Sequence, residues 1–387
     1  MEFEISPEQK AFQRAFRTFA RKEITPLVDE AEEKEKFPIP LIKKMGELGY
    51  LCISCPEQYG GPGATKMMEY DYIEELSAIS MGIALTICVQ NYSSYYLLHF
   101  GTEDQRQRYM VPAIRGEKIL AYAATEADAG CDRLRMRTFA KKEDGKFILN
   151  GTKLYTTSAG FADAILVEAF TDKSKGIQGM SLFAVEKGAK GFSASKKLRK
   201  LGARSSENYE LAFEDCIVPE KNMVGQPGKS QDLRRKVLAP SLALESAHAI
   251  GIARAAYEAS LEYSKIRVQF NRPIGQFQGV SFKIADMAVS IDAARLLAYR
   301  VAWLADQKQD CYHEGLISKL YASEMALRVT EEALQIHGAF GYMMESPVQR
   351  YHRDARMLPI SKGPSNIYRI LISRNLGLIA DDHYPVS

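Results

Sequence analysis

The sequence predicts an α+β protein in three parts: an N-terminal helical domain over residues 1–117, a middle antiparallel β-domain over 118–226 and a C-terminal helical domain over 227–387. Helical periodicity dominates both ends of the chain, and short segments with strand-like alternation replace it after Leu120. A chain of 387 residues is also too long for one ordinary hydrophobic core. We therefore expect a β-domain that is flanked in sequence by two helical domains.

The N-terminal part contains amphipathic helices and one apolar segment. Residues 8–28 repeat apolar side chains near the helical period, and Pro26 stands near their end. Residues 76–99 are uncharged and largely apolar all round, which predicts helices buried inside a bundle. Gln90 and Asn91 lie within that segment, where a polar side chain is costly unless it is paired or faces a ligand. Both roles stay open for these residues.

The middle part has the pattern of a sheet. In the segment KFILNGTKLYTT, Asn150 and Gly151 predict a hairpin turn between two short strands. Further strands are predicted in AILVEAF, MSLFAVE and NYELAFEDCIV. The loop VGQPGKS then leads into long helical patterns that continue from Leu233 to the end.

Composition excludes several functional classes. The net charge is only +3, with Lys and Arg spread along the chain, so a nucleic-acid or membrane-surface role has little support. No segment approaches the roughly 20 apolar residues of a membrane span, and the acidic, helical N-terminus predicts no targeting peptide. Cys52 and Cys55 form the only C-x-x-C pair among six cysteines, and no second pair follows it. We expect a structural turn there, no metal site and a cytoplasmic protein.

A glycine-rich and basic stretch lies near the C-terminus. Gly338 and Gly341 end a helix after Gln335, an arginine-rich run follows, and the loop Lys362–Asn366 opens another apolar helix. This arrangement resembles the C-terminal signature of the acyl-CoA dehydrogenases, with Q-x-x-G-G-x-G-Y followed by R-x-x-R-D-A-R. The resemblance covers essentially the whole chain. It implies FAD, a CoA thioester substrate, a C-terminal four-helix bundle and a flavin contact at Gln335 and Gly338.

A second motif runs from Tyr122 to Asp132 and resembles the family's T-E-P-x-A-G-S-D. The resemblance implies that Tyr122, Ala124 and Thr125 meet the flavin at a strand end, with Gly130 in the following loop. Cys131 stands where the family has a serine that touches flavin and CoA, so a good hydrogen-bond donor is replaced by a weak one. Taken alone, this loop is equally consistent with a plain turn.

Two further motifs complete the implied cofactor site. The segment after Lys153 resembles K-x-W-I-T, which implies that Tyr155 shields the flavin and Thr157 bonds its edge. The segment from Arg267 to Gln278 resembles R-x-x-F-G-x-P-I-x-x-F-Q, in which Arg267 and Phe270 reach a neighbouring subunit's FAD. A homotetramer, and an electron acceptor such as electron-transfer flavoprotein, are implied in turn.

One position departs from the family and bears on the chemistry. Lys362 stands where the family has its catalytic glutamate, and a lysine is a base only when desolvation makes it neutral. Its backbone N–H, with that of Gly363, still suits polarisation of a thioester carbonyl. Pro364 replaces a threonine that binds the flavin, which leaves Asn366 as a substitute.

Other residues are candidates for the missing base. Some family members carry the glutamate on the helix before G-I-A-R-A-A-Y, at the place of Ser241; Glu245 lies one helical turn later on the same face. Glu245 is either a base in the acyl pocket or the partner of a nearby Lys or Arg.

A subgroup resembling cyclohex-1-ene-1-carboxyl-CoA dehydrogenase uses an aspartate where this chain has Asn91, followed by Tyr92. The resemblance favours dehydrogenation of an alicyclic thioester by 1,4-elimination to a conjugated diene. A conventional dehydrogenase that uses Glu245, a flavin-dependent oxygenase or reductase, and a flavin- and CoA-binding relative without dehydrogenase activity are the alternatives.

Overall fold

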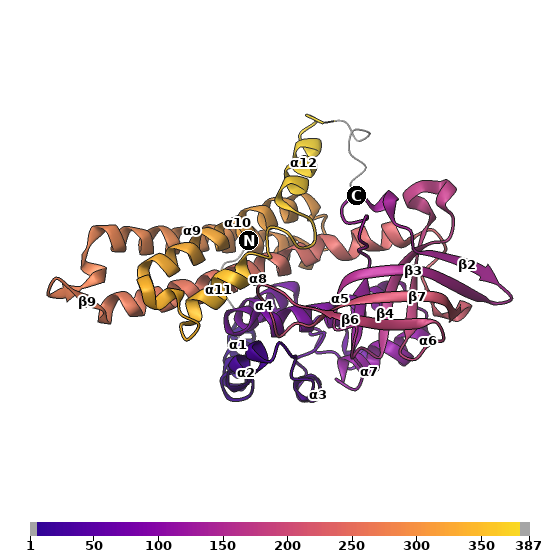
Figure 1. Ribbon diagram of the computed structural model, residues 1–387, viewed down its shortest axis with the longest axis horizontal. Coiled ribbons are helices and arrows are strands. Elements are labelled where there is room, and N and C mark those ends of the chain that lie inside the picture. Colours follow the sequence, from indigo (N-terminus) through magenta and orange to yellow (C-terminus); the bar gives the residue numbers. More distant parts are fainter. Residues whose placement is uncertain (1–5, 380–387) are drawn as a thin grey trace.

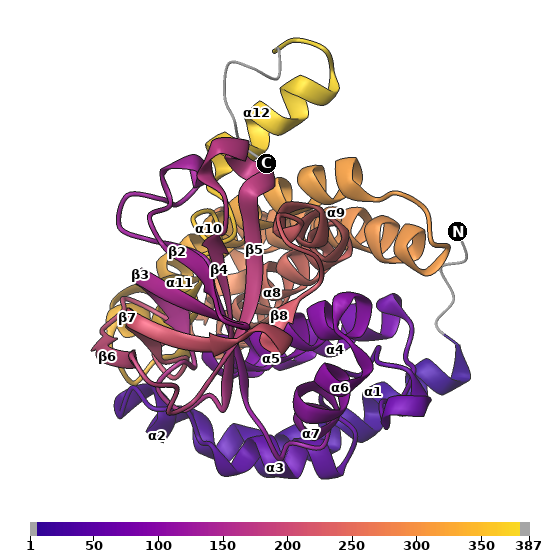
Figure 2. The ribbon, with the colours of Figure 1, turned by 90° about the vertical axis from the view of Figure 1, so that its right-hand side faces the viewer.

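The computed structural model describes residues 6–379. A β-domain forms one end of the molecule, long C-terminal helices extend away from it, and the N-terminal helices pack along one side of both (Figures 1 and 2). This is the predicted order of helical, β and helical parts. Within residues 6–379, no helix is both long and apolar enough to cross a membrane.

Among the N-terminal helices, α4 and α5 are buried and pack against α8, which confirms that the apolar segment lies inside a bundle. Gln90 of α5 is paired with the protein itself. Its Oε1 accepts from the N–H of Leu120 at 2.7 Å, and its Nε2 donates to the carbonyls of Ala113 and Lys118. The helix bounds are α1 Pro7–Phe19, α2 Val28–Glu33, α3 Pro40–Glu47, α4 Lys66–Ile79, α5 Met81–Phe100, α6 Glu103–Gln105 and α7 Val111–Ile114.

The sheet is mixed, so the prediction of a purely antiparallel β-domain is wrong in part. β1 pairs with β4 in parallel, and β2 also meets the end of β4 in parallel, whereas the other neighbouring strands are antiparallel. Parallel neighbours need a long connection, and the β2–β3 hairpin supplies it between β1 and β4. The strands are β1 Leu120–Ala123, β2 Phe139–Glu143, β3 Lys146–Thr157, β4 Ala164–Phe170, β5 Met180–Glu186, β6 Phe192–Leu198, β7 Asn208–Pro219 and β8 Met223–Val224.

The hairpin turn at Asn150 and Gly151 is also a wrong prediction, because both residues lie within the long strand β3. The turn is made by Asp144 and Gly145, whose φ angles of 43° and 73° suit a two-residue hairpin. Gly151 sits instead at a register shift, where a Cβ atom would come within 2.6 Å of the Thr138 Cα. The glycine therefore serves a close approach between strands rather than a turn.

The C-terminal domain is built on three long helices that run back and forth. α8 contacts α4 and α5 of the N-terminal part as well as α9 and α10 of its own domain. α10 ends at His337 and Gly338 follows with a φ of 61°, as its glycine pattern predicted. The elements are α8 Ser230–Ile266, β9 Val268–Gln269, β10 Arg272–Pro273, α9 Gln278–Asp306, α10 Tyr312–His337, α11 Pro347–Ala355 and α12 Ser365–Asn375.

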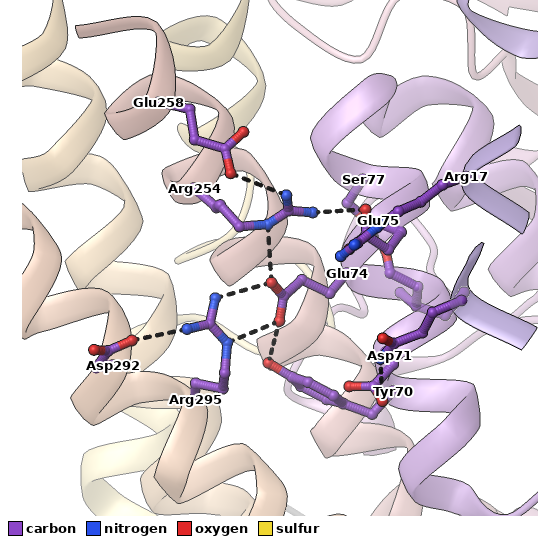
Figure 3. Close-up of polar contacts among 12 residues, drawn as sticks. Arg17, Tyr70, Asp71, Glu74, Glu75, Ser77, Arg254, Glu258, Asp292 and Arg295 are labelled. Atoms are coloured by element: carbon purple, nitrogen blue, oxygen red, sulfur yellow. Dashed lines mark hydrogen bonds and ion pairs between the residues drawn. The ribbon is translucent and has the colours of Figure 1, made fainter. Parts of the chain in front are cut away.

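A network of charges joins α4 to α8 and α9 (Figure 3). The carboxylate of Glu74 receives Arg254 at 3.0 Å, Arg295 at 2.9 Å and the hydroxyl of Tyr70 at 2.9 Å. Glu74 is buried, so its negative charge is tolerated because two guanidinium groups and a hydroxyl bind it. The network ties the N-terminal helices to the C-terminal ones.

We expect Glu74→Gln to destabilise the protein by about 3 kcal/mol, because both arginines would lose their shared carboxylate inside the interface. The measurement is the thermal unfolding midpoint followed by circular dichroism. Glu258→Gln is the matched control, since Glu258 pairs with the same Arg254 at 3.1 Å but its side chain is 57% exposed. Equal midpoints for the two variants would contradict the importance of Glu74.

Candidate functional site

The candidate site lies where the middle of α8 meets α5 and the turn that precedes α12. Glu245 of α8 is 4% exposed, and Cys88 of α5 and His248 of α8 are also buried. Glu245 and His248 are three residues apart, so they share one face of the helix. One ligand-type atom from each of Cys88, Glu245 and His248 lies within 4.8 Å of the other two. The structure thus brings a carboxylate, a thiol and an imidazole together.

Lys362 completes this cluster from the turn. Its Nζ atom lies 2.7 Å from Oε1 of Glu245 and 4.6 Å from the centre of the Tyr92 ring. The ammonium therefore has a carboxylate on one side and an aromatic face on the other, and both stabilise a positive charge. The structure thus brings together three residues that the sequence indicated as candidates: Lys362, Glu245 and Tyr92.

The turn that carries Lys362 is held by two other side chains. Lys362 and Gly363 both have positive φ angles, 49° and 115°. The hydroxyl of Tyr368 donates to the Lys362 carbonyl at 3.1 Å, and Nζ of Lys319 donates to the Gly363 carbonyl at 2.9 Å. These two bonds stabilise a backbone conformation that is uncommon for a lysine. They fix the direction in which Lys362 enters the site.

The ion pair sets the protonation of both partners. Burial pushes the pKa of Glu245 up, but the Lys362 ammonium, aided by Lys319, outweighs it and holds that pKa below its usual range. Burial would lower the pKa of Lys362, yet Glu245 above all keeps it higher than usual. A neutral Lys362 base therefore finds no support in this arrangement.

Two other candidate site residues, Asn91 and Ser241, are engaged elsewhere. Asn91 Oδ1 accepts from the backbone N–H of Cys52 at 2.9 Å, while its Nδ2 is buried without a partner among the described residues. The Ser241 hydroxyl donates to the Leu238 carbonyl of its own helix at 2.8 Å. Asn91 is thus held against the loop of Cys52, and the structure gives it no acid–base partner.

A second buried charge pair lies beside the strand-end motif, and the sequence analysis did not predict it. Arg133 forms an ion pair with Glu168 of β4, and the Tyr122 hydroxyl also donates to Glu168. Burial lowers the pKa of Arg133 to about 10 and raises that of Tyr122 to about 12, so both keep their protons at neutral pH. Tyr122 is therefore bound to Glu168. A lone acidic residue inside the apolar strand AILVEAF was the signal in the sequence.

The β-domain presents an open wall where the resemblance implies a flavin. Tyr155 is 64% exposed with a φ of 59°, at a register shift of β3 that turns its ring outward. No atom lies within 4 Å of the place where a Cβ on Gly130 would stand. Thr157 lies at the end of β3, and its hydroxyl accepts from Asn208 at 3.3 Å. An exposed ring beside open backbone fits a flat cofactor such as FAD.

Neighbouring motif residues support this wall rather than extend it. The carbonyl of Ala124 accepts from Nζ of Lys153 at 3.0 Å, and the carbonyl of Thr125 accepts from the N–H of Leu154 at 2.8 Å. The loop after β1 is thereby fixed to β3. Cys131 is partly exposed on that loop, and burial raises the pKa of its thiol.

The remaining motif residues lie at the other end of the molecule. Arg267 and Phe270 belong to the β9–β10 hairpin, which Figure 1 places at the end opposite to β2 and β3. Phe270 is 87% exposed. Gln335 and Gly338 line an open cavity of about 580 Å³ at the end of α10, and Gln278 begins α9 nearby. Within one chain, these residues and the wall at Tyr155 do not meet. Pro364 and Asn366 lie at a third place, the start of α12, separate from both the wall at Tyr155 and the hairpin.

The ion pair predicts how stability responds to pH. Lys362→Met should lower the free energy of unfolding at pH 8 by about 3 kcal/mol, the low end for a buried pair because Lys362 is partly exposed. In the variant, burial is the largest remaining influence on Glu245 and raises its folded pKa above the unfolded 4.5. The cost of burying the ionised Glu245 carboxylate is therefore absent below pH 4.5, where Glu245 is protonated in both the folded and the unfolded state. This cost grows as the pH rises through the folded pKa.

The check is chemical unfolding of wild type and variant at pH 5 and pH 8. The double variant Lys362→Met, Glu245→Gln removes both charges with similar volume and should recover most of the stability at pH 8. A deficit that is equal at both pH values, or unrescued by the second change, would contradict an ionised pair.

Comparison with known proteins covers almost the whole chain. Family models match as the acyl-CoA dehydrogenase N-terminal domain over residues 6–117, middle domain over 121–216 and C-terminal domain over 238–377. An acyl-CoA dehydrogenase of Bacillus subtilis (strain 168) is 40% identical over 373 residues, 96% of this chain and 98% of the relative.

Two solved structures superpose closely. Butyryl-CoA dehydrogenase of Megasphaera elsdenii has a TM-score of 0.94 with 36% identity, covering 97% of this chain and all of that one. A chain from work on the electron-transferring flavoprotein of Acidaminococcus fermentans has a TM-score of 0.95 with 37% identity, covering 97% and 99% of the two chains. The protein described here therefore belongs to the acyl-CoA dehydrogenase family and is an FAD-dependent oxidoreductase that acts on a CH–CH bond of acyl-CoA thioesters.

Proposed function

We propose that this protein dehydrogenates an acyl-CoA thioester between C2 and C3, with Glu245 as the base that removes the C2 proton. The supporting observation is the 2.7 Å distance between Lys362 Nζ and Glu245 Oε1. Lys362 stands at the position of the glutamate that the family resemblance implies, and its ammonium contacts Glu245. Glu245 brings a carboxylate to the same space from α8 instead of from the turn.

The electrostatics suit this role. A carboxylic acid acts as a general base only in its deprotonated form. The Lys362 ammonium holds the pKa of Glu245 low against the effect of burial, so the carboxylate is charged at neutral pH. A lower pKa also makes Glu245 a weaker base, so proton removal is expected to be slower than with an unpaired carboxylate.

The turn at Lys362 has a second role in the proposal. Tyr368 and Lys319 bind the two backbone carbonyls of the turn. The backbone N–H of Lys362, with that of Gly363, is assigned to the thioester carbonyl, where charge develops when C2 loses its proton. FAD, when bound, accepts the hydride that leaves C3. The wall formed by Tyr155, Thr157 and Gly130 is assigned to the flavin.

A short saturated acyl group is the proposed substrate. Lys362 and Tyr92 approach each other beside Glu245 and take up room there, and the Megasphaera relative is a butyryl-CoA dehydrogenase. The alicyclic thioester that the sequence favoured requires a proton acceptor at Asn91, whose Oδ1 is bound to Cys52. Cyclohex-1-ene-1-carboxyl-CoA is therefore the alternative substrate, to be compared with butyryl-CoA.

We expect Glu245→Gln to lower the rate of anaerobic flavin bleaching by butyryl-CoA by roughly 10²–10⁴-fold, the contribution of a positioned general base. The measurement is stopped-flow absorbance of the FAD-loaded enzyme. Asn91→Leu is the control and should keep the rate within a few-fold. A protein that binds FAD and CoA but never bleaches would contradict the proposed activity. Faster bleaching of wild type by the alicyclic thioester would overturn the substrate assignment.

The cofactor site is proposed to be shared between subunits of a homotetramer. The exposed Phe270 and Arg267 and the cavity at Gln335 lie far from the wall at Tyr155 in one chain (Figure 1). One FAD contacts both sets if two chains pack with opposite ends together, so that the arginine of one chain reaches the cofactor of the other. Electron-transfer flavoprotein is the proposed acceptor, since the Acidaminococcus relative comes from a study of that protein.

Arg267→Gln should reduce FAD occupancy, because the implied guanidinium contact with the pyrophosphate would be lost. FAD per chain is measured from absorbance after gel filtration, and the assembly by analytical ultracentrifugation. Arg14→Gln, on the exposed face of α1, is the matched control. A wild-type monomer with one FAD per chain would rule out the shared site.

A further inference from the structure

His248 is a buried histidine that the proposed mechanism has not yet used. It is fully buried on α8, and its Nδ1 lies 2.8 Å from the hydroxyl oxygen of Ser77 on α4. That hydroxyl donates to the carbonyl of Ile73 at 2.6 Å. A serine has one hydroxyl proton, so Ser77 has none left for the imidazole and accepts from it instead. The arrangement therefore assigns the ring proton to Nδ1.

The other ring nitrogen follows from this assignment. With Nδ1 protonated, a neutral imidazole carries a lone pair on Nε2. Burial lowers the pKa of His248 to about 4, so the ring is neutral at physiological pH. Nε2 is buried and has no hydrogen-bond partner among the described residues. An unsatisfied acceptor in the interior is costly unless some state of the protein supplies a donor.

Glu245 is the neighbouring group that can become such a donor. A carboxylate oxygen of Glu245 and a ring nitrogen of His248 lie within 4.8 Å of each other. Ionised, Glu245 has no proton to offer; once protonated, it becomes an O–H donor. The other groups that face Glu245 are Lys362 from the turn, Lys319 from α10 and Tyr368 from α12, with Cys88 from α5 beside it.

A metal ion is the other occupant that such a cluster suggests. Cys88, Glu245 and His248 have ligand-type atoms at suitable mutual distances. The Lys362 ammonium, however, already lies 2.7 Å from Glu245 and compensates its charge. A divalent cation would place further positive charge beside that ammonium, and Coulomb repulsion at such distances opposes it. The geometry favours a proton over a metal at this place.

We propose that His248 is a positioning residue whose unprotonated Nε2 accepts a hydrogen bond from Glu245 after Glu245 has taken the substrate's proton. The proposal rests on Glu245 as the base. The C2–H bond breaks, its proton forms an O–H bond on Glu245, and the hydride from C3 goes to the FAD of the established activity. Proton transfer weakens the attraction between Glu245 and Lys362, and the new bond to His248 offsets part of that loss. Ser77 keeps the tautomer that makes this possible.

The test compares His248→Leu, which has no acceptor, with His248→Gln, whose carbonyl oxygen restores one. We expect His248→Leu to lower kcat roughly tenfold, the value of one buried hydrogen bond, with KM little changed. The C2-deuterium isotope effect on kcat should rise, because proton removal becomes more rate-limiting. The acidic limb of the kcat profile should move to lower pH, since the protonated form of Glu245 loses its acceptor. His248→Gln should stay within about threefold of wild type.

The kcat of Ser77→Ala should fall between those of the two His248 variants, because the imidazole remains but Ser77 no longer holds its proton on Nδ1. Ser260→Ala is its matched control, since Ser260 is equally buried and donates to the Ala256 carbonyl of its own helix. ¹⁵N NMR of histidine-labelled wild type provides a readout that needs neither turnover nor a variant. His248 should appear as a neutral ring with its proton on Nδ1 that fails to titrate between pH 5 and 8; the buried His337, whose Nδ1 donates to the Ala333 carbonyl, is the second ring expected with this tautomer.

A folded, FAD-containing His248→Leu with unchanged kcat, isotope effect and pH profile would overturn the inference while leaving Glu245 as the base. An Nε2-protonated ring at this position would overturn it even if every variant failed to fold. Full activity of Glu245→Gln would instead remove the proposed function, and the inference with it.

Discussion

Every charged group that α8 carries into the interior of this protein has to be matched by a group from another element. An unmatched ion in a protein interior costs several kcal/mol, comparable to the whole stability of a domain. Glu245 is matched by Lys362 of the turn before α12. About two and a half helical turns further on, near α4, Arg254 is matched by Glu74 and Glu75. The helix thus joins the N-terminal bundle and the C-terminal turn through charge as well as through apolar packing.

This constraint gives Lys362 a different meaning from the one that its position suggests. A glutamate at position 362 would stand beside Glu245, and two carboxylates in contact would force one of them to stay protonated. With Glu245 on α8, a cation at position 362 is the electrostatically consistent choice. The lysine that seemed to remove the family's base is therefore the counter-ion of a carboxylate from another helix.

The sequence predicted the fold well because its signals are local. The apolar helix α5, the glycine end of α10 and the alternating strands follow from side chains within one or two turns of each other. The wrong predictions concern partners. Asn150 and Gly151 have the composition of a hairpin turn, but Gly151 is required by the close passage of Thr138, the residue before the neighbouring strand β2. Parallel pairing of β1 with β4 likewise depends on a strand about forty residues away.

The same distinction holds for the site. Tyr155, Thr157, Arg267 and Gln335 were found because each lies in a motif of contiguous residues, although their roles toward FAD stay predictions. His248, Lys319 and Glu168 were missed because each is a single polar residue in an apolar pattern, and its partner comes from another element. Buried polar residues seldom stay unpaired, so an isolated one predicts a partner without naming it. For Glu245, the sequence left two roles open, and the structure supplies one partner that is compatible with both.

The arrangement also separates two kinds of function within one chain. The carboxylate, its counter-ion and its neighbouring imidazole all come from a single subunit and lie around the buried middle of α8. The residues implied for FAD are divided between an exposed wall on the β-domain and an exposed hairpin at the opposite end (Figure 1). The ionisation of Glu245 is therefore set by groups of its own chain. If FAD is shared between subunits as proposed, a change at the hairpin should alter its retention without disturbing that ionisation.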